Sequence, residues 1–465
     1  MVIMYLLHYR TKNGQGHLNG MTNIYSLLLV LIFSISIING QEKPNVILIL
    51  ADDMALGDLG NLNGRLNKTP HLDQLMDSGM FFSSAYSASA VCTPARAALL
   101  TGKYPHKTGA VTLNMERFPE LSRVKLNERT IGDLFREQGY STGLIGKWHI
   151  GDGEEYHPLR RGFQEFVGFK GYDVPKDYYN YRLDFQGIYR EITNEYLTDV
   201  LTENAIEFVE EHQNEPFFLH LAYYTPHRPL SAPQDLIDFY LSKGFDLNTA
   251  TIYAMIEVMD KGIGKLMQTL KQKSLLKNTI IVFASDNGPD PLVGERYNLN
   301  QRGTKYTINE GGIHVPLIFY WEGKIKPSIQ EQIVHFTDIL PTLLDLCNLT
   351  ISDSISFDGG SIGPLLLGSS LNLELPRYRY WQWNRGIPYY SHNAAIRDGD
   401  WKLVFPYVSR EMIHSESDSL PMLYNIKDDP YEKKNLSNME KTRYNTMWTE
   451  LNQWGREVER HRLTN

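Results

Sequence analysis

The stretch Asn45-Val-Ile-Leu-Ile-Leu-Ala51-Asp52-Asp53 decides the fold of this 465-residue chain. A continuous apolar run without alternation is typical of a strand that is buried on both faces of a parallel sheet. Two carboxylates follow directly, at the end of the strand where open α/β sheets place their ligands. Asp is also favoured at the start of a helix, so a capping role for the pair is the alternative interpretation.

Residues 278–285 repeat this design, because a second buried strand ends in Asp286-Asn287-Gly288. Residues 140–145 and 216–222 have the same apolar character. Amphipathic helical patterns lie between these strands, at residues 70–79, 130–138, 197–211 and 253–271. This alternation predicts an α/β fold with a large mixed, mostly parallel sheet sandwiched by helices.

The character of the chain changes beyond about residue 371. Short strand patterns at 394–397 and 401–405 are separated by turn residues, and a final helix is expected over 441–460. We therefore predict a main α/β domain over 41–370 and a C-terminal subdomain over 371–465, with a small antiparallel sheet plus a helix. Residues 156–189 lack periodicity and are expected to form an irregular insertion.

Composition excludes some function classes and leaves others open. The chain is 42% hydrophobic and 22% charged, with a formal net charge of −8, which gives no reason to expect nucleic-acid binding. Its two cysteines are Cys92 and Cys347. A disulfide between them is possible by arithmetic, but the apolar surroundings of Cys347 predict a small core residue instead.

Residues 24–38 form an apolar run that is short for a transmembrane helix and is followed by Asn39-Gly40-Gln41. This pattern predicts a secretory signal region over 1–40, with the mature chain starting near Gln41 and Met21 as an alternative start to Met1. An uncleaved anchor is the alternative. We expect a secreted or periplasmic protein without a stable membrane anchor.

Residues 92–102 read Cys92-Thr-Pro-Ala-Arg96-Ala-Ala-Leu-Leu-Thr101-Gly102. Taken alone, the segment would fit a buried cysteine at an ordinary helix start. The chain adds Gly-Lys147-Trp-His149-Ile-Gly after a buried strand, and residues two apart in an extended segment point to one face. Two more motifs follow: the Pro-His pair that ends at His227 and the Gly-Thr-Lys element that ends at Lys305.

Together these motifs resemble the type I sulfatases of the alkaline-phosphatase-like superfamily, and most closely the bacterial polysaccharide sulfatases. Two positions depart from the family pattern. His314 stands where arginine is usual, and Tyr224 stands where some members have a further histidine, so that only His227 is carried over. His106 is a tempting base, but a loop histidine whose hydrogen bonds are satisfied is the favoured interpretation.

The resemblance implies that a maturation enzyme oxidises Cys92 to formylglycine. It also implies a metal site whose ligands are Asp52, Asp53, Asp286, Asn287 and the modified Cys92. The four unmodified ligands offer only oxygen, which suits calcium or magnesium, and their roomy shell favours one calcium ion.

The resemblance further assigns catalytic and substrate-binding roles. Arg96 would stabilise the formylglycine hydrate and Asp286 would deprotonate it, while Lys147 and Lys305 would bind the sulfate group. His227 would protonate the leaving alcohol, with Lys305 as a contributor, and His149 would take the proton that triggers sulfate release.

The expected function is therefore hydrolysis of sulfate esters in a sulfated carbohydrate, with a polysaccharide or oligosaccharide as the expected substrate class. Aromatic residues within 172–189 and 378–390 are candidates to stack on sugar rings, with core packing as the equal alternative. Two rival functions stay open: a formylglycine-dependent phosphodiester or phosphonate hydrolase, and a non-catalytic protein that binds sulfated glycans.

Overall fold

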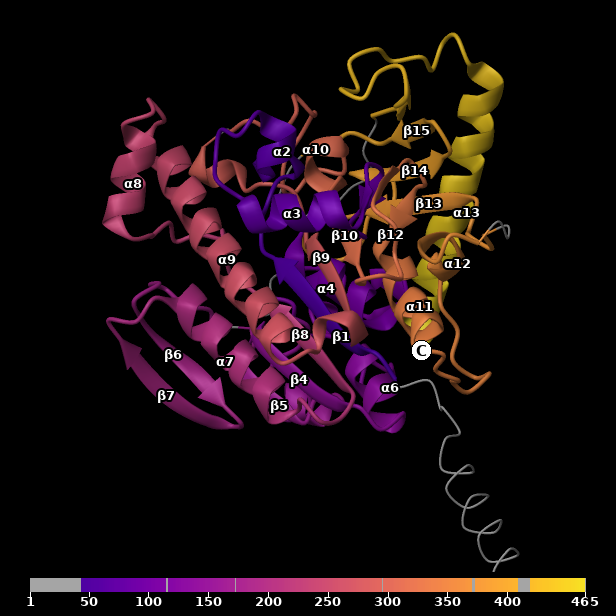
Figure 1. The fold of residues 1–465 in the computed structure, drawn as a ribbon. Helices are drawn as coiled ribbons and strands as arrows, with labels where there is room; N and C mark the ends of the chain where they lie inside the picture. Colours follow the sequence, from indigo (N-terminus) through magenta and orange to yellow (C-terminus); the bar gives the residue numbers. More distant parts are fainter. Residues whose placement is uncertain are drawn as a thin grey trace, which may run out of the picture. The chain divides into compact units, whose positions relative to one another are not determined.

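Strand β1 (Asn45–Ala51) lies inside a ten-stranded sheet and is buried along its whole length (Figure 1). The computed structural model describes residues 43–113, 116–171, 173–294, 296–369, 373–408 and 419–464, so the predicted signal region at 1–40 lies outside the described residues. The strand order of the sheet is β11-β2-β10-β9-β1-β8-β4-β5-β6-β7. The remaining strands are β2 (Met80–Phe82), β4 (Ser141–Lys147), β5 (Glu165–Phe169), β6 (Asn180–Phe185), β7 (Ile188–Thr193), β8 (Phe217–Ala222), β9 (Thr279–Ser285), β10 (Leu317–Tyr320) and β11 (Ser328–Gln330).

Five neighbouring strands, β9-β1-β8-β4-β5, run parallel to one another. Antiparallel pairs occur where β10 joins β9 and β2, and where β6 joins β5 and β7. The sheet is therefore mixed and mostly parallel at its centre, as the apolar strand patterns predicted.

Alternate side chains of β1 enter two different hydrophobic cores. Val46, Leu48 and Leu50 belong to one core, and Ile47 and Ile49 belong to the other. Because both faces of the strand are covered, neither face tolerates polar residues, and this explains the unbroken apolar run in the sequence.

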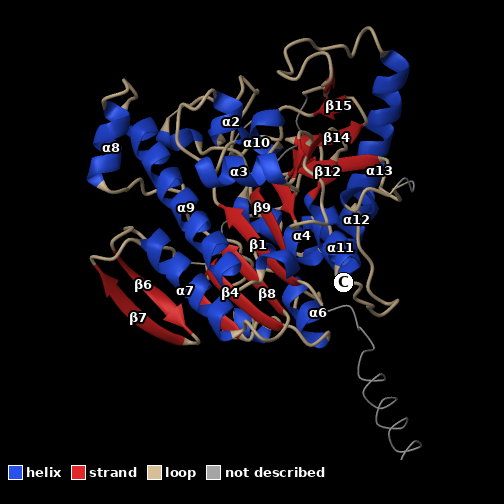
Figure 2. Cartoon of the chain, viewed as in Figure 1, coloured by secondary structure: helices blue, strands red, loops and turns tan. Residues whose placement is uncertain are grey.

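Helices cover both faces of the sheet (Figure 2). One core is shared with α3 (Pro70–Ser78), α7 (Leu197–Glu211), α8 (Gln234–Leu241) and α9 (Leu247–Gln272). The other is shared with α4 (Cys92–Thr101), α6 (Ile131–Glu137), α11 (Phe336–Leu346) and α12 (Gly363–Leu366). Three further short helices among the described residues are α2 (Gly60–Asn63), α5 (Pro105–Thr108) and α10 (Glu310–Ile313).

A four-stranded antiparallel sheet and a long helix form the C-terminal part of the chain. Its strands are β13 (Tyr378–Gln382), β14 (Ala394–Asp398), β15 (Trp401–Val404) and β16 (Met422–Asn425), and its helix is α13 (Lys441–Thr464). Strands β3 (Ala85–Tyr86) and β12 (Val334–His335) form a separate two-stranded sheet. The expected small antiparallel sheet with one helix is present.

The prediction of an irregular insertion over 156–189 is wrong, because β5, β6 and the start of β7 lie there. Tyr181 and Leu183 of β6 point inward and are buried, so the strand does alternate. The two residues that join β6 to β7, Gln186 and Gly187, both have positive φ, as a tight hairpin turn requires. Strand β7 is the exposed edge of the sheet, and this is why its sequence carries no hydrophobic pattern.

Among the described residues, none of the helices is both long enough and apolar enough to cross a membrane.

Candidate active site

Four adjacent parallel strands, β9, β1, β8 and β4, end at the same edge of the sheet and carry the predicted site residues there. Asp52 follows β1, Asp286 follows β9, Lys147 ends β4, and His227 lies in the turn after β8. Residues far apart in the sequence thus converge at one place, as ligand sites of open α/β sheets do.

Cys92 is the first residue of α4 and is completely buried. Its Sγ lies 3.4 Å from Oδ1 of Asp52. Burial, together with the negative charges of Asp286 and Asp52, raises the pKa of the thiol well above its usual value. The thiol is therefore protonated at neutral pH, which makes the unmodified cysteine a poor nucleophile.

Arg96 lies one turn further along α4 and connects the ends of three strands. Its Nε donates to Oδ2 of Asp286 at 3.0 Å, and its Nη1 donates to the backbone oxygen of Lys147 at 3.0 Å. Its Nη2 lies 3.5 Å from Oδ2 of Asp52. This guanidinium is fully buried and holds the carboxylates at fixed positions.

Two lysines form ion pairs with the carboxylates of Asp52 and Asp53. Nζ of Lys147 lies 2.5 Å from Oδ2 of Asp52, and Nζ of Lys305 lies 2.7 Å from Oδ1 of Asp53. Three acids and three cations therefore balance in one buried cluster: Asp52, Asp53 and Asp286 against Arg96, Lys147 and Lys305.

The three carboxyl groups differ in their proton affinity. Burial opposes ionisation of Asp52, but Lys147, His227 and Arg96 outweigh it and hold the pKa of Asp52 well below its usual value. The pKa of Asp286 is raised to about 6 by burial and by the nearby charge of Asp52. Asp286 is thus the carboxylate of this cluster that most readily accepts a proton.

The donor set fits a hard divalent cation. Asp52 and Asp53 offer carboxylate oxygens that lie within 4.8 Å of the Cys92 sulfur and of a ring nitrogen of His227, whereas Asp286 does not belong to this group. Oδ1 of Asn287 is buried and has no hydrogen-bond partner among the described residues, while its amide nitrogen donates to Oδ1 of Asp53 at 2.6 Å. A buried oxygen without a donor beside a carboxylate pair is what a cation that prefers oxygen ligands would satisfy.

His227 has one ring nitrogen fixed and the other directed at the cluster. Nδ1 donates to the backbone oxygen of Arg228 at 2.6 Å, and Nε2 lies 3.7 Å from Oδ2 of Asp53. Burial and the charge of Lys305 lower the pKa of His227 to about 4, so the ring is neutral without an added anion.

His149 lies two residues after the end of β4 in a left-handed backbone conformation with φ 62°. Its Nδ1 is buried without a hydrogen-bond partner among the described residues. Burial, followed by the charges of Lys147 and Arg96, lowers the pKa of His149 well below its usual value. A neutral imidazole with a free nitrogen is suited to accept a proton.

Two aromatic residues that support His227 were not identified as site residues from the sequence. The ring of Tyr224 stacks on the ring of His227 at a centroid distance of 4.7 Å. Tyr178 stacks on Tyr224, and its hydroxyl donates to the backbone oxygens of Tyr224 and His227 at 3.0 and 2.8 Å. Tyr178 is one of the aromatic residues within 172–189 considered for stacking on sugar rings, but it is completely buried, which favours the alternative of core packing.

Three other residues, His106, Cys347 and His314, make their contacts outside the carboxylate cluster. His106 is buried in α5, where Nε2 contacts Oε1 of Gln382 at 2.9 Å. Cys347 is a buried residue of the core shared by β4, β9 and α11, and it forms no disulfide with Cys92. His314 contacts Gln301 and the backbone of Ser83.

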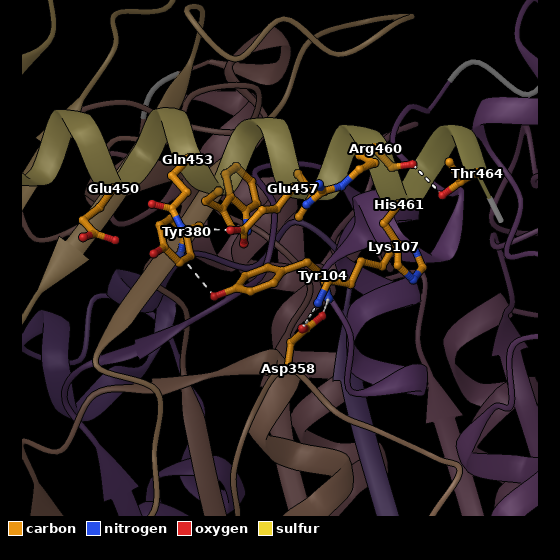
Figure 3. Close-up of a pocket in the computed structure, with 12 residues that line it drawn as sticks. Tyr104, Lys107, Asp358, Tyr380, Glu450, Gln453, Glu457, Arg460, His461 and Thr464 are labelled. Carbon is orange, nitrogen blue, oxygen red and sulfur yellow. Dashed lines mark hydrogen bonds and ion pairs between the residues drawn. The ribbon is translucent and has the colours of Figure 1, made fainter.

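The aromatic residues of the 378–390 region pack mainly against the C-terminal helix. Tyr380 stacks on Trp454 at 4.9 Å, and Tyr390 contacts the same ring. A pocket of about 580 Å³ lies beside α13 and is lined by Tyr380, Trp454 and Tyr104, among others (Figure 3). None of the predicted catalytic or metal-binding residues lines this pocket. Tyr172, in the other aromatic region, lies outside the described residues.

Comparison with known proteins identifies the family. The sulfatase family model matches residues 44–349, and a model described as N-sulphoglucosamine sulphohydrolase, C-terminal, matches residues 303–460. Mouse arylsulfatase J is 31% identical over 453 residues, covering 86% of this chain and 73% of the relative. The uncharacterized sulfatase YdeN of Escherichia coli (strain K12) is 29% identical, covering 80% of each chain.

Solved structures agree with this assignment. The crystal structure of Ps i-CgsB has a TM-score of 0.77 and 31% identity to this chain, covering 89% of this chain and 93% of that one. A second structure of Ps i-CgsB, in complex with k-i-k-neocarrahexaose, has the same TM-score at 30% identity and the same coverage. The chain belongs to the sulfatase family and is an enzyme, a sulfuric ester hydrolase.

Proposed function

We propose that this sulfatase releases inorganic sulfate from a sulfated poly- or oligosaccharide, with a formylglycine derived from Cys92 as its nucleophile. The observation that carries the proposal is the position of Cys92, which is fully buried at the start of α4 beside Asp52. Its thiol is held in the protonated form, so the site gains a good nucleophile only after conversion of the side chain.

The modification requires a maturation enzyme as a partner. A hydrated formylglycine would supply two hydroxyl groups on one carbon, one to attack sulfur and one to expel sulfate. Arg96 is placed to hold the hydrate, because it lies one turn from Cys92 on the same helix. Asp286, with a pKa of about 6, is largely ionised at neutral pH and accepts the proton of the attacking hydroxyl.

Asp52, Asp53, Asp286 and Asn287, with the modified Cys92, would hold one divalent cation, for which calcium fits the oxygen-only set better than magnesium. A cation there would neutralise charge on the sulfate group and lower the repulsion among the carboxylates. Asp286 also pairs with Arg96 at 2.8 Å, so Arg96 keeps this carboxylate oriented.

Lys147 and Lys305 bind the sulfate oxygens in the proposed reaction. Both ammonium groups are almost fully buried and close to Asp52 and Asp53. Their charges are therefore poorly screened by solvent, and fixed charges of this kind stabilise a charged transition state strongly.

His227 is the proposed acid for the leaving alcohol. Its pKa of about 4 reflects burial and the repulsion from Lys305. A bound sulfate ester, being an anion, opposes that repulsion and raises the pKa of the ring toward the working range. His149, neutral and with a free Nδ1, accepts the proton that accompanies sulfate release.

Replacing His227 with alanine is expected to reduce kcat/KM for alkyl sulfates by about 10² to 10⁴-fold, because the alkoxide leaving group then departs without a proton. Activated aryl sulfates, whose phenolate leaves readily, should lose less than about tenfold, because they need no such proton. Steady-state rates on a series of esters graded by leaving-group pKa measure the difference. Equal losses across the series would assign His227 a positioning role instead.

A phosphodiester or phosphonate hydrolase is the second candidate of the same fold. A phosphonate monoester hydrolase shares the fold, with a TM-score of 0.64 at 20% identity. Paired assays with sulfate and phosphate esters of one alcohol test the proposal. We expect kcat/KM for the sulfate ester to exceed that for the phosphate ester by at least about 10²-fold. This ratio corresponds to roughly 3 kcal/mol of transition-state stabilisation, which is what one well-placed charged contact supplies. Faster phosphate hydrolysis would overturn the proposed reaction, and no turnover of either would favour a glycan-binding protein.

The carbohydrate substrate is supported by the relatives rather than by a described sugar site. The structure of Ps i-CgsB with a neocarrahexaose shows that protein in complex with an oligosaccharide. We propose a substrate of the same broad class, and a secreted or periplasmic location, where such polymers are met. We also propose that the chain is divided into a catalytic domain, residues 41–370, and a C-terminal subdomain, residues 371–465.

A further inference from the structure

Lys305 lies in an irregular segment, residues 302–314, which contains only the single turn of α10 as regular structure. The segment folds tightly back on itself. A Cβ on Gly311 would lie 2.1 Å from the backbone oxygen of Gly303, and one on Gly312 would lie 1.8 Å from the backbone oxygen of Thr307. The backbone nitrogens of Lys305 and Tyr306 donate to the backbone oxygens of Pro289 and Ala90, each at 2.9 Å. The rest of the segment has little regular structure, so side-chain contacts from outside it also contribute to its conformation.

Asn393 contacts the backbone of this segment directly after Lys305. It precedes β14, is almost fully buried, and has a left-handed backbone with φ 45°. Its Nδ2 donates to the backbone oxygens of Tyr306 and Trp383, each at 2.8 Å, and its Oδ1 accepts from the backbone nitrogen of Ile308 at 3.1 Å. One side chain of the C-terminal part thus binds the backbone of Tyr306 and Ile308, which stand one and three residues after Lys305.

Lys402 of β15 holds the far end of the same segment. Its Nζ is completely buried and lies 2.8 Å from Oε1 of Glu310 and 3.1 Å from Oε1 of Glu432. Oε2 of Glu432 accepts from the backbone nitrogen of Glu310 and from the side chain of Asn309, each at 2.9 Å. Lys402 therefore pairs with two buried carboxylates, one within this segment and one, on Glu432, that binds the segment from outside.

The charges around Lys402 keep Glu310 ionised, and the ion pair between them therefore persists. Burial favours the neutral form of Glu310, but Lys402 and Arg397 outweigh it and lower the pKa of Glu310 to about 2. Glu310 is thus ionised at any working pH and also accepts from the hydroxyl of Tyr86 at 2.7 Å. A buried ion pair of this kind contributes fixed geometry more than stability.

We infer that Asn393 and Lys402 are positioning residues for Lys305, which hold its ammonium group at the carboxylate cluster from the C-terminal sheet. The inference rests on the sulfate-binding role proposed for Lys305. It makes the C-terminal sheet part of the catalytic apparatus, although none of its residues contacts the cluster in the hydrogen bonds and ion pairs described above.

The test is a double-mutant cycle with Lys305. Asn393→Asp keeps the shape and the acceptor for Ile308 but places a carboxylate oxygen against two backbone oxygens. We expect it to lower kcat/KM by about 10 to 100-fold in the wild-type background, because small displacements of a charged group cost that much. In a Lys305→Ala background, itself reduced by about 10² to 10³-fold, Asn393→Asp should lower kcat/KM by less than about threefold.

Arg379→Met provides the matched control. Nη2 of Arg379, on β13, lies 2.8 Å from Oδ2 of Asp338, on α11, and both side chains are buried. This ion pair also links the C-terminal sheet to the rest of the protein, but through α11 rather than through the segment 302–314. The variant should lower the melting temperature while kcat/KM stays within about threefold of wild type, as expected for a change away from the reacting groups.

Lys402→Met repeats the cycle from the other end of the segment, and Asn393→Asp decides the outcome if Lys402→Met does not fold. Equal losses from Asn393→Asp in both backgrounds would overturn the inference, because the residue would then act independently of Lys305. Full activity of Lys305→Ala would instead overturn the role proposed for Lys305 itself. The two failures are therefore distinguishable.

Discussion

Replacing Cys92 with alanine is expected to reduce kcat/KM by at least about 10⁴-fold, because the residue that becomes the nucleophile is lost while the binding groups remain. The alanine side chain is smaller than the thiol and the site is fully buried, so the fold should persist with a modest loss of stability. Sulfate release from a chromogenic aryl sulfate, with circular dichroism of the same preparation, measures both.

Cys347→Ala is the matched control, because it removes the chain's other cysteine, which is equally buried but lies in the hydrophobic core. It should lower the melting temperature without reducing kcat. Peptide mass spectrometry on the fragment that contains Cys92 completes the test, since conversion of cysteine to formylglycine lowers the mass by about 18 Da. Active enzyme with an unmodified Cys92, or an active Cys92→Ala variant, would rule out the proposed nucleophile.

Removing divalent cations is expected to abolish turnover, with recovery on addition of calcium. Asp53→Asn should weaken calcium binding by at least about tenfold and lower kcat/KM by about 10² to 10³-fold, because one carboxylate of the set is replaced by a neutral amide. Asparagine is chosen because Asp53 has φ 65°, a conformation that asparagine tolerates. Isothermal titration gives the affinity without relying on activity.

Asp260→Asn is the matched control for this effect. Asp260 is another completely buried aspartate, but it lies on α9 and accepts from the backbone nitrogens of His71 and Leu72. Its replacement should leave calcium affinity unchanged. The wild-type chain should gain about 2.7 kcal/mol of stability when calcium is present at 100 times its Kd. A melting temperature indifferent to calcium and to chelator would contradict the proposed metal site.

The sequence alone predicts the centre of the sheet well. Strands β1 and β9 are buried on both faces, so their apolar runs are continuous, and each ends at a polar pair that lies in the cluster. Helix α9 is also predicted, but it begins at Leu247 rather than near residue 253, because Asp246 caps it by accepting from the backbone nitrogens of Asn248 and Thr249.

The parts that local sequence does not reveal depend on tertiary contacts. Strand β7 is exposed and has no hydrophobic pattern, and Tyr178 looks like any other aromatic residue of a polar segment. Asn393 stands 88 residues after Lys305 in the chain, and nothing near it in sequence shows that its amide meets the backbone of Tyr306 and Ile308. Motif residues can be recognised by type and spacing, whereas residues that hold them in place are found only in the fold.

The two-sided burial of β1 makes this strand intolerant of a change in length. Removing one residue from it would exchange the side chains facing the two cores, because side-chain direction alternates along a strand. The same shift would move the Asp52 carboxylate from the side of α4, where Cys92 lies, into the opposite apolar core. Substitutions of similar volume can accumulate in β1, but insertions and deletions would destroy the core and the reaction site together.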